Sequence, residues 1–185
     1  LKATEGFMLF GYNTSSSAPL IKNCILSKNS ANVGAGVYCK RSNPDVVNCI
    51  LFQNAGSALF TSNSTPRVIN CTIVQNSGTS SFGGGAVFVE GSSSPVIRNS
   101  ILWDNAVPEI LLSDSIISVT YSCVAGGYTG QGNIKINPRF LDAAFGDLRL
   151  DQYSPCIDTA TANAAPSEDI LGVERPQGHG YDMGA

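Results

Sequence analysis

The sequence contains little charge and almost no histidine. Only 14% of its 185 residues are Asp, Glu, Lys or Arg, the net charge is −3, and no block of basic residues occurs. A nucleic-acid-binding protein needs a basic patch, so we expect no nucleic acid partner. His179 is the single histidine. Because no second cluster of Cys or His could complete a zinc site, we predict no metal and no cofactor.

Long apolar runs are also missing. None approaches the length of about 18 residues that a membrane-spanning helix requires, so we expect no membrane span. The composition is instead rich in Gly, Ser, Asn and small apolar residues, which favour tight turns and narrow strands over helices. This predicts an all-β protein with a single domain. The chain begins at Leu1, and we expect it to be part of a longer protein.

A motif of eleven residues occurs four times. It reads "PLIKNCILSKN", "PDVVNCILFQN", "PRVINCTIVQN" and "PVIRNSILWDN", starting at Pro19, Pro44, Pro66 and Pro95. A sequence period of this size is typical of a solenoid, in which each repeat buries its apolar face against its neighbours. Alternating apolar positions predict short strands with two inward-facing residues each.

Two columns of asparagine recur where these strands meet. They are Asn23, Asn48, Asn70 and Asn99, and then Asn29, Asn54, Asn76 and Asn105. Asn tolerates the left-handed backbone of a sharp bend, and stacked amides can hydrogen-bond from coil to coil. A third strand per coil is predicted in "GAGVYCK", "SALFT" and "GGGAVFVE", with Val37 and Cys39, Ala58 and Phe60, and Val87 and Val89 facing inward.

Three strands per coil with Asn at the bends resemble the right-handed parallel β-helix repeat family, over roughly residues 17–115. The segments "TYSCVAGGYTGQGNIKINPRFLD", "GDLRLDQYSPCIDTA" and "RPQGHGYDMGA" resemble the closing part of secreted β-helix proteins similar to polymorphic outer-membrane proteins. The resemblance to pectate lyases is more distant. The resemblance to the β-helix repeat family implies a β-helix of about five or six coils over residues 1–115, and a last coil and capping tail over residues 116–185. It also implies an extracellular or cell-surface location.

The cysteines Cys24, Cys49 and Cys71 form one inward column. Stacked at the strand spacing of about 4.8 Å, their Cβ atoms lie slightly too far apart for a relaxed disulfide. We interpret them as buried thiols, with a disulfide between two neighbours as the alternative.

The outward positions give little support for catalysis. Glycoside hydrolysis needs two neighbouring carboxyl groups, but no two acids stack in the columns that contain Asp45 and Glu90. Asp45 beside Arg67 suggests a surface ion pair. Asp104, Glu109 and Asp114 lie around Pro108 in a segment that we expect to be a loop. We therefore predict a non-catalytic module that serves as a scaffold or a binding surface. The alternative is the C-terminal part of a polysaccharide lyase or glycoside hydrolase.

Outward apolar residues must be covered or bind a partner. We expect the tail to cover two columns, which are Ile25, Ile50, Thr72 and Ile101, and Ser27, Phe52, Val74 and Trp103. A further row, Tyr38, Leu59 and Phe88 with Lys40 and Glu90 nearby, is the candidate surface for a polysaccharide or a surface protein. Alternatively, residues 77–83 or an upstream coil cover this row. We expect an open N-terminal end that can self-associate.

Overall fold

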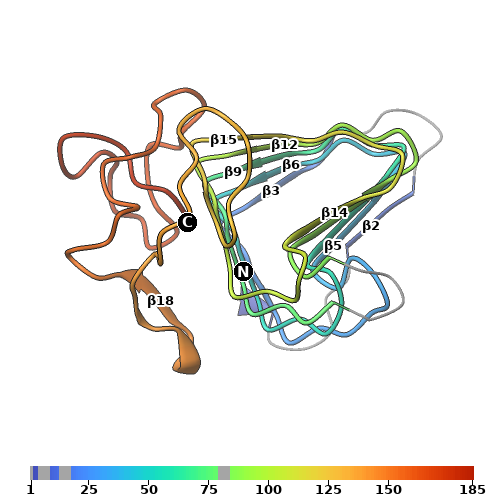
Figure 1. Ribbon diagram of the computed structural model, residues 1–185, viewed down its shortest axis with the longest axis horizontal. Helices are drawn as coiled ribbons and strands as arrows, with labels where there is room; N and C mark the ends of the chain where they lie inside the picture. The colour runs from blue at the N-terminus through green and yellow to red at the C-terminus, as the bar shows by residue number, and fades with distance from the viewer. Residues whose placement is uncertain (1, 4–8, 13–17, 79–83) are drawn as a thin grey trace.

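The computed structural model describes residues 2–3, 9–12, 18–78 and 84–185, and its strands form three parallel sheets (Figure 1). Sheet A contains β1 (Lys2–Ala3), β4 (Ile25–Ser27), β7 (Ile50–Phe52), β10 (Thr72–Val74), β13 (Ile101–Trp103) and β16 (Cys123–Val124). Sheet B contains β2 (Leu9–Tyr12), β5 (Val37–Lys40), β8 (Leu59–Ser62), β11 (Val87–Glu90) and β14 (Ile110–Leu112). Sheet C contains β3 (Leu20–Lys22), β6 (Asp45–Val47), β9 (Arg67–Ile69), β12 (Val96–Arg98) and β15 (Ser118–Thr120).

The chain passes from sheet C to sheet A to sheet B in each turn of a parallel β-helix. Four turns are complete: β3–β5, β6–β8, β9–β11 and β12–β14. Incomplete turns flank them, with β1 and β2 at one end and β15 and β16 at the other. The predicted all-β solenoid is confirmed, but five or six coils is an overestimate for complete turns. In the described part of the chain, no helix is long and apolar enough to cross a membrane.

The core lies inside the three sheets and follows the predicted inward columns of sheets A and C. In sheet C, Val46 pairs with Val68, and Ile97 pairs with Val119. In sheet A, Leu26, Leu51, Ile73, Leu102 and Val124 lie in register and are buried. Because each inward residue stacks on its equivalent one turn away, a single continuous apolar core runs along the solenoid.

The two asparagine columns have different tasks. Asn23, Asn48, Asn70 and Asn99 adopt positive φ angles of 48–57°, as predicted for a sharp bend. In the second column the left-handed residue is the one before each asparagine: Lys28, Gln53, Gln75 and Asp104. The second set of asparagines therefore does not form the bend itself. Side-chain hydrogen bonds between turns occur in both columns, and in the first they run from Asn48 to Asn23 and from Asn99 to Asn70.

In sheet B the predicted inward pairs of β5 and β11 are confirmed, but β8 differs from the predicted register by one residue. Val37 pairs with Leu59 and Leu59 with Val87, so Leu59 faces the core, and Phe60 lies in the outer row between Tyr38 and Phe88. Thr61 likewise faces inward, and Ser62 takes the outer position. Ala58, Leu59 and Phe60 are all apolar, so alternation alone could not select the inward pair.

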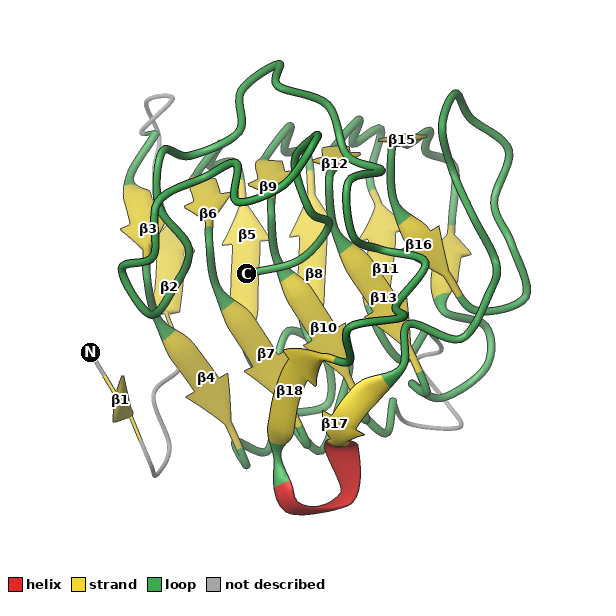
Figure 2. Ribbon diagram, turned by 90° about the vertical axis from the view of Figure 1, so that its left-hand side faces the viewer, coloured by secondary structure: helices red, strands yellow, loops and turns green. Residues whose placement is uncertain are grey.

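The tail begins after β16 and runs along the outside of sheet A (Figures 1 and 2). It contains an antiparallel hairpin of β17 (Phe140–Asp142) and β18 (Asp147–Leu150), joined through the 3-10 helix η1 (Ala143–Phe145). The first asparagine column anchors the tail: Asn70 Nδ2 donates to the carbonyl groups of Asp182 and Gly184 at 3.1 and 3.2 Å. Asn99 exchanges two hydrogen bonds with the Thr161 backbone.

Candidate binding sites

The second asparagine column forms a one-way ladder of hydrogen bonds. Asn29 Nδ2 donates to Asn54 Oδ1 at 3.0 Å, and Asn54 Nδ2 donates to Asn76 Oδ1 at 2.8 Å. Asn76 Nδ2 in turn donates to Asn105 Oδ1 at 2.8 Å. Each Oδ1 also accepts the backbone N–H of the preceding asparagine in the ladder. Since every amide donates toward the C-terminal end, the last asparagine needs an acceptor beyond it.

Glu109 supplies that acceptor. Its Oε1 accepts the Asn105 backbone N–H at 3.1 Å, and its Oε2 accepts Asn105 Nδ2 at 2.8 Å. Burial raises the pKa of the Glu109 carboxyl above its ordinary value, although both hydrogen bonds from Asn105 act in the opposite direction. At the surface, the residues that precede the last two asparagines of the ladder are also bonded, since Gln75 Nε2 donates to Asp104 Oδ2 at 3.2 Å. Two carboxylates thus lie together at the C-terminal end of the solenoid.

A cavity of about 550 Å³ lies beside these carboxylates, and we call it the end pocket. It is lined by Trp103, the last residue of β13, by residues 104–110, and by residues 124–128 at the start of the tail. Trp103 and Tyr128 are half-buried, while Asp104 is exposed to solvent. Burial raises the pKa of the Tyr128 hydroxyl. The pocket therefore combines aromatic rings, a solvent-accessible carboxylate and the backbone of Gly126 and Gly127.

The row that the sequence predicts as a binding surface is largely covered. The rings of Tyr38 and Phe60 stack at a centroid distance of 4.8 Å, and Phe60 meets Phe88 edge to face at 5.4 Å. Phe60 is only 4% exposed and Phe88 only 8%. Gly34, with a φ of 63°, packs its backbone on this row, since a Cβ atom there would lie 3.0 Å from the Cβ atoms of Phe60 and Tyr38. The row therefore presents little ring surface to a partner.

The charged residues predicted near this row are separated. Lys40 pairs with Ser62, and Ser62 pairs with Glu90, so Lys40 and Glu90 are two turns apart. Leu59, the third apolar member of the predicted surface, belongs to the core. The predicted ion pair between Asp45 and Arg67 is confirmed, with an N–O distance of 3.3 Å at an exposed site.

A second cavity, of about 700 Å³, lies between sheet A and the tail, and we call it the tail cleft. Ile25, Ile50, Thr72 and Ile101 form its floor. The tail buries Thr72 and Ile101 and leaves Ile25 and Ile50 half-buried, so the predicted covering of this column is confirmed for its C-terminal part. Both arginines on its wall have partners: Arg149 donates to Asp147, and Arg175 donates to the carbonyl groups of Asp182 and Gly184.

The six cysteines are free thiols. The predicted column of Cys24, Cys49 and Cys71 is confirmed, and the thiols of Cys49 and Cys71 donate to backbone carbonyl groups. Burial raises the pKa of Cys39, on sheet B, to about 12. In the described parts of the chain, no three His, Cys, Asp or Glu side chains gather in a way that could hold a metal ion.

Sequence reasoning missed the end pocket. Trp103 belongs to a column that we expect the tail to cover, and no sequence pattern marks Tyr128. The sequence period gave no signal for Glu109, because this residue lies only four positions after Asn105 and takes the place of a further asparagine only in space.

The comparisons with known proteins identify the fold family. The model for the "right handed beta helix region" matches residues 13–133, which is more than half of the chain. Searches of curated proteins and of solved structures gave no match. The matched region contains the four complete turns, the asparagine ladder and the start of the tail. The chain therefore belongs to the right-handed β-helix family.

Proposed function

We propose that this chain is a non-catalytic module of a larger secreted or cell-surface protein, and that it binds neutral carbohydrate in the end pocket. The observation that carries the proposal is the composition of this pocket. Trp103 and Tyr128 contribute half-buried aromatic rings to its wall, and Asp104 and the backbone of Gly126 and Gly127 contribute hydrogen-bonding groups. Mostly apolar walls with a few polar groups are typical of small-ligand sites, and aromatic rings suit the apolar faces of sugars.

The charge of the pocket restricts the class of ligand. Asp104 and Glu109 both line the end pocket, and the Asp104 charge further raises the pKa of Glu109. Anionic polysaccharides such as those built from uronic acids would be repelled by two carboxylates. The hydroxyl groups of neutral glycans can instead donate hydrogen bonds to the Asp104 carboxylate. A neutral oligosaccharide is therefore the ligand class that the pocket suits best.

A scaffold role alone would not require this pocket, and the tail cleft is a weaker candidate. The two arginines of the tail cleft, Arg149 and Arg175, are engaged with other tail residues. In the end pocket, the Asp104 side chain is exposed, and its Oδ2 atom accepts a hydrogen bond from Gln75. A ligand can reach this carboxylate without breaking the packing of the tail.

A glycoside hydrolase is the second candidate, and one observation favours it. Glu109 has a raised pKa, as a general acid needs, and a second carboxylate lies in the same pocket. Both Glu109 oxygens accept hydrogen bonds from Asn105, however, so proton donation would disrupt the end of the ladder. Binding without cleavage is therefore the proposal that agrees better with the geometry.

Titration of the protein with neutral and uronate oligosaccharides tests the proposal. Trp103 is the only tryptophan of the chain, so its fluorescence reports directly on the end pocket. We expect saturable changes with a neutral glycan, and calorimetry should show at least a tenfold loss of affinity in Trp103→Ala. Phe145→Ala is the matched control, because Phe145 is an exposed aromatic residue at the tail cleft.

Each alternative has a distinct result. Release of reducing or unsaturated ends, lost in Asp104→Asn, would replace the binding role with a catalytic one. Loss of glycan binding in Phe145→Ala but not in Trp103→Ala would move the site to the tail cleft. Absence of binding to every neutral glycan tested would refute carbohydrate recognition and leave the scaffold role.

A further inference from the structure

Two cysteines from different parts of the chain are buried together beneath the tail. Cys123 lies in β16, the last strand of sheet A, and Cys156 lies in the tail after β18. Both are 0% exposed. They pack in one apolar cluster with Ile101 and Met183, separate from the main core of the solenoid. The cluster is the place where the tail and the last turn of the solenoid join.

The two thiols are neighbours within this buried cluster. The Cys156 thiol is the first cause of the raised pKa of Cys123, and burial is the second. Cys123 Sγ also donates to the carbonyl group of Ile136 at 3.2 Å. Because both cysteines already lie in one cluster, a disulfide of about 2.05 Å between them would not require distant parts of the chain to come together.

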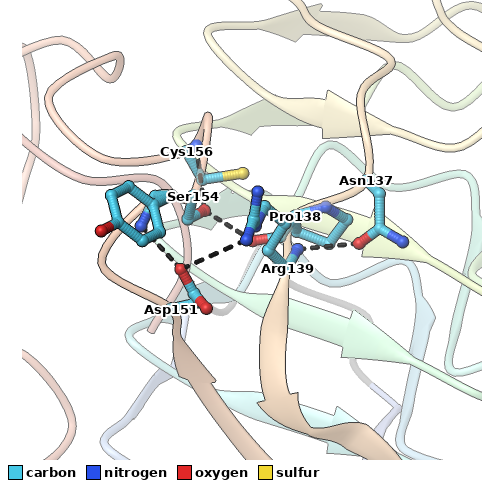
Figure 3. Close-up of polar contacts among 7 residues, drawn as sticks. Asn137, Pro138, Arg139, Asp151, Ser154 and Cys156 are labelled. Carbon is cyan, nitrogen blue, oxygen red and sulfur yellow. Dashed lines mark hydrogen bonds and ion pairs between the residues drawn. The ribbon is translucent and has the colours of Figure 1, made fainter.

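The backbone around Cys156 is held in place from several sides (Figure 3). Ser154 Oγ donates to the Pro138 carbonyl group at 2.5 Å and accepts the Cys156 backbone N–H at 3.1 Å. The Cys156 carbonyl group accepts the Met183 backbone N–H at 2.9 Å. Arg139 pairs with Asp151 at 3.7 Å and so helps to close the same turn. Cys156 is therefore presented to Cys123 by a fixed turn.

We propose that Cys123 and Cys156 are the site of a disulfide that fastens the tail to the solenoid when the protein folds in the presence of a small-molecule disulfide. One thiolate attacks the small disulfide, forming a mixed disulfide and releasing one thiol. The second cysteine then displaces the other thiol. In total, the two cysteines lose two protons and two electrons, and the small disulfide gains them as it becomes two thiols.

This pairing is favoured over pairing within the cysteine column. Cys24, Cys49 and Cys71 lie on successive turns, where the strand spacing of about 4.8 Å holds their Cβ atoms farther apart than a relaxed disulfide allows. The segments of Cys123 and Cys156 are not paired with each other as strands, so the separation of these two cysteines is not fixed by a sheet. The proposal is independent of carbohydrate binding in the end pocket.

Refolding of the full chain with reduced and oxidised glutathione, followed by tryptic mapping without reduction, tests the pairing. Cleavage after Arg98, Lys135 and Arg149 places Cys123 in residues 99–135 and Cys156 in residues 150–185, because the bond before Pro176 resists trypsin. We expect these two peptides to be joined and to separate on reduction. The oxidised protein should unfold at a higher urea concentration than the reduced protein, and Cys156→Ser should lose both effects.

Cys39→Ser is the matched control, because Cys39 is equally buried but lies on sheet B. It should retain the linked peptides and the shift of the urea midpoint. If oxidised wild-type protein retains six titratable thiols after denaturation, or links two of Cys24, Cys49 and Cys71 instead, the proposal is wrong. This result uses unaltered protein and therefore does not depend on whether a variant folds.

Discussion

Replacement of Glu109 tests whether the asparagine ladder needs an acceptor at its end. In Glu109→Ala, the Asn105 backbone N–H and Nδ2 both lose their Glu109 acceptor. Asn105 Nδ2 retains the carbonyl groups of Ile73 and Trp103, but the backbone N–H has no replacement partner in the ladder. An orphaned buried donor costs about 1–3 kcal/mol and the second lost bond about 1 kcal/mol. We expect unfolding free energy to fall by about 2–4 kcal/mol.

Glu109→Gln provides the sharper comparison. Within the ladder, one amide oxygen accepts both the backbone N–H and the Nδ2 group of the preceding asparagine. A glutamine oxygen can do the same for Asn105, and no charge is then buried. We expect a loss of no more than about 1 kcal/mol at neutral pH, which is the value of one ordinary hydrogen bond.

The pH dependence of the same pair has a defined sign. Burial raises the Glu109 pKa above its ordinary value of 4.5, so the folded state favours the protonated carboxyl. The stability that the carboxyl contributes is complete below pH 4.5 and is lost as pH rises through the folded pKa. Wild-type protein should therefore lose stability relative to Glu109→Gln as the pH rises above about 4.5.

Urea unfolding followed by Trp103 fluorescence measures these differences, because Trp103 lies in the pocket that contains Glu109. Asn163→Ala, at an exposed tail position, is the control and should change stability by less than about 0.5 kcal/mol. Equal losses in Glu109→Ala and Glu109→Gln would show that the ladder does not depend on an acceptor at its end. If the unfolding free energies of wild-type protein and of Glu109→Gln change in parallel at all pH values, the pKa of Glu109 is not raised in the folded state.

The other predictions concern the tail, the register and the thiols. Asn70→Ala should increase amide hydrogen exchange in residues 182–185, because Asn70 binds two carbonyl groups there; unchanged exchange would mean that apolar contacts alone hold the tail. Leu59→Ala should cost about 2–5 kcal/mol in chemical unfolding, as for other buried leucines, whereas an outward Leu59 would tolerate the change. Cys39, with a pKa of about 12, should resist alkylation by iodoacetamide at pH 8 in folded protein; rapid modification would refute its burial.

Much of the solenoid could be predicted from the sequence because the repeated residues have one physical reason each. Asn48 and Asn70 occupy left-handed bends, and Val46 and Val68 stack in the core. Sheet B was harder, because Leu59 and Phe60 are both apolar and both buried. Alternation identifies an inward face only when the outward residues are polar, and that condition fails here.

The end pocket could not be predicted because no repeat describes it. Trp103 comes from the last complete turn and Tyr128 from the start of the tail, and their approach depends on the path of the chain between them. The sequence identifies Glu109 as an acid in a loop-like segment, but the role of this residue follows from its position beside Asn105, which periodicity alone does not give. The contact between Cys123 and Cys156 likewise depends on where the tail lies.

The one-way ladder has a consequence for how the length of this protein can change. An added turn with asparagine at the matching position could be inserted anywhere between Asn29 and Asn105, since it would accept from one neighbour and donate to the next. The same turn placed after Glu109 would face a carboxylate that has no hydrogen to offer. Duplication of internal repeats can therefore lengthen the solenoid, while its C-terminal boundary stays at the same residue.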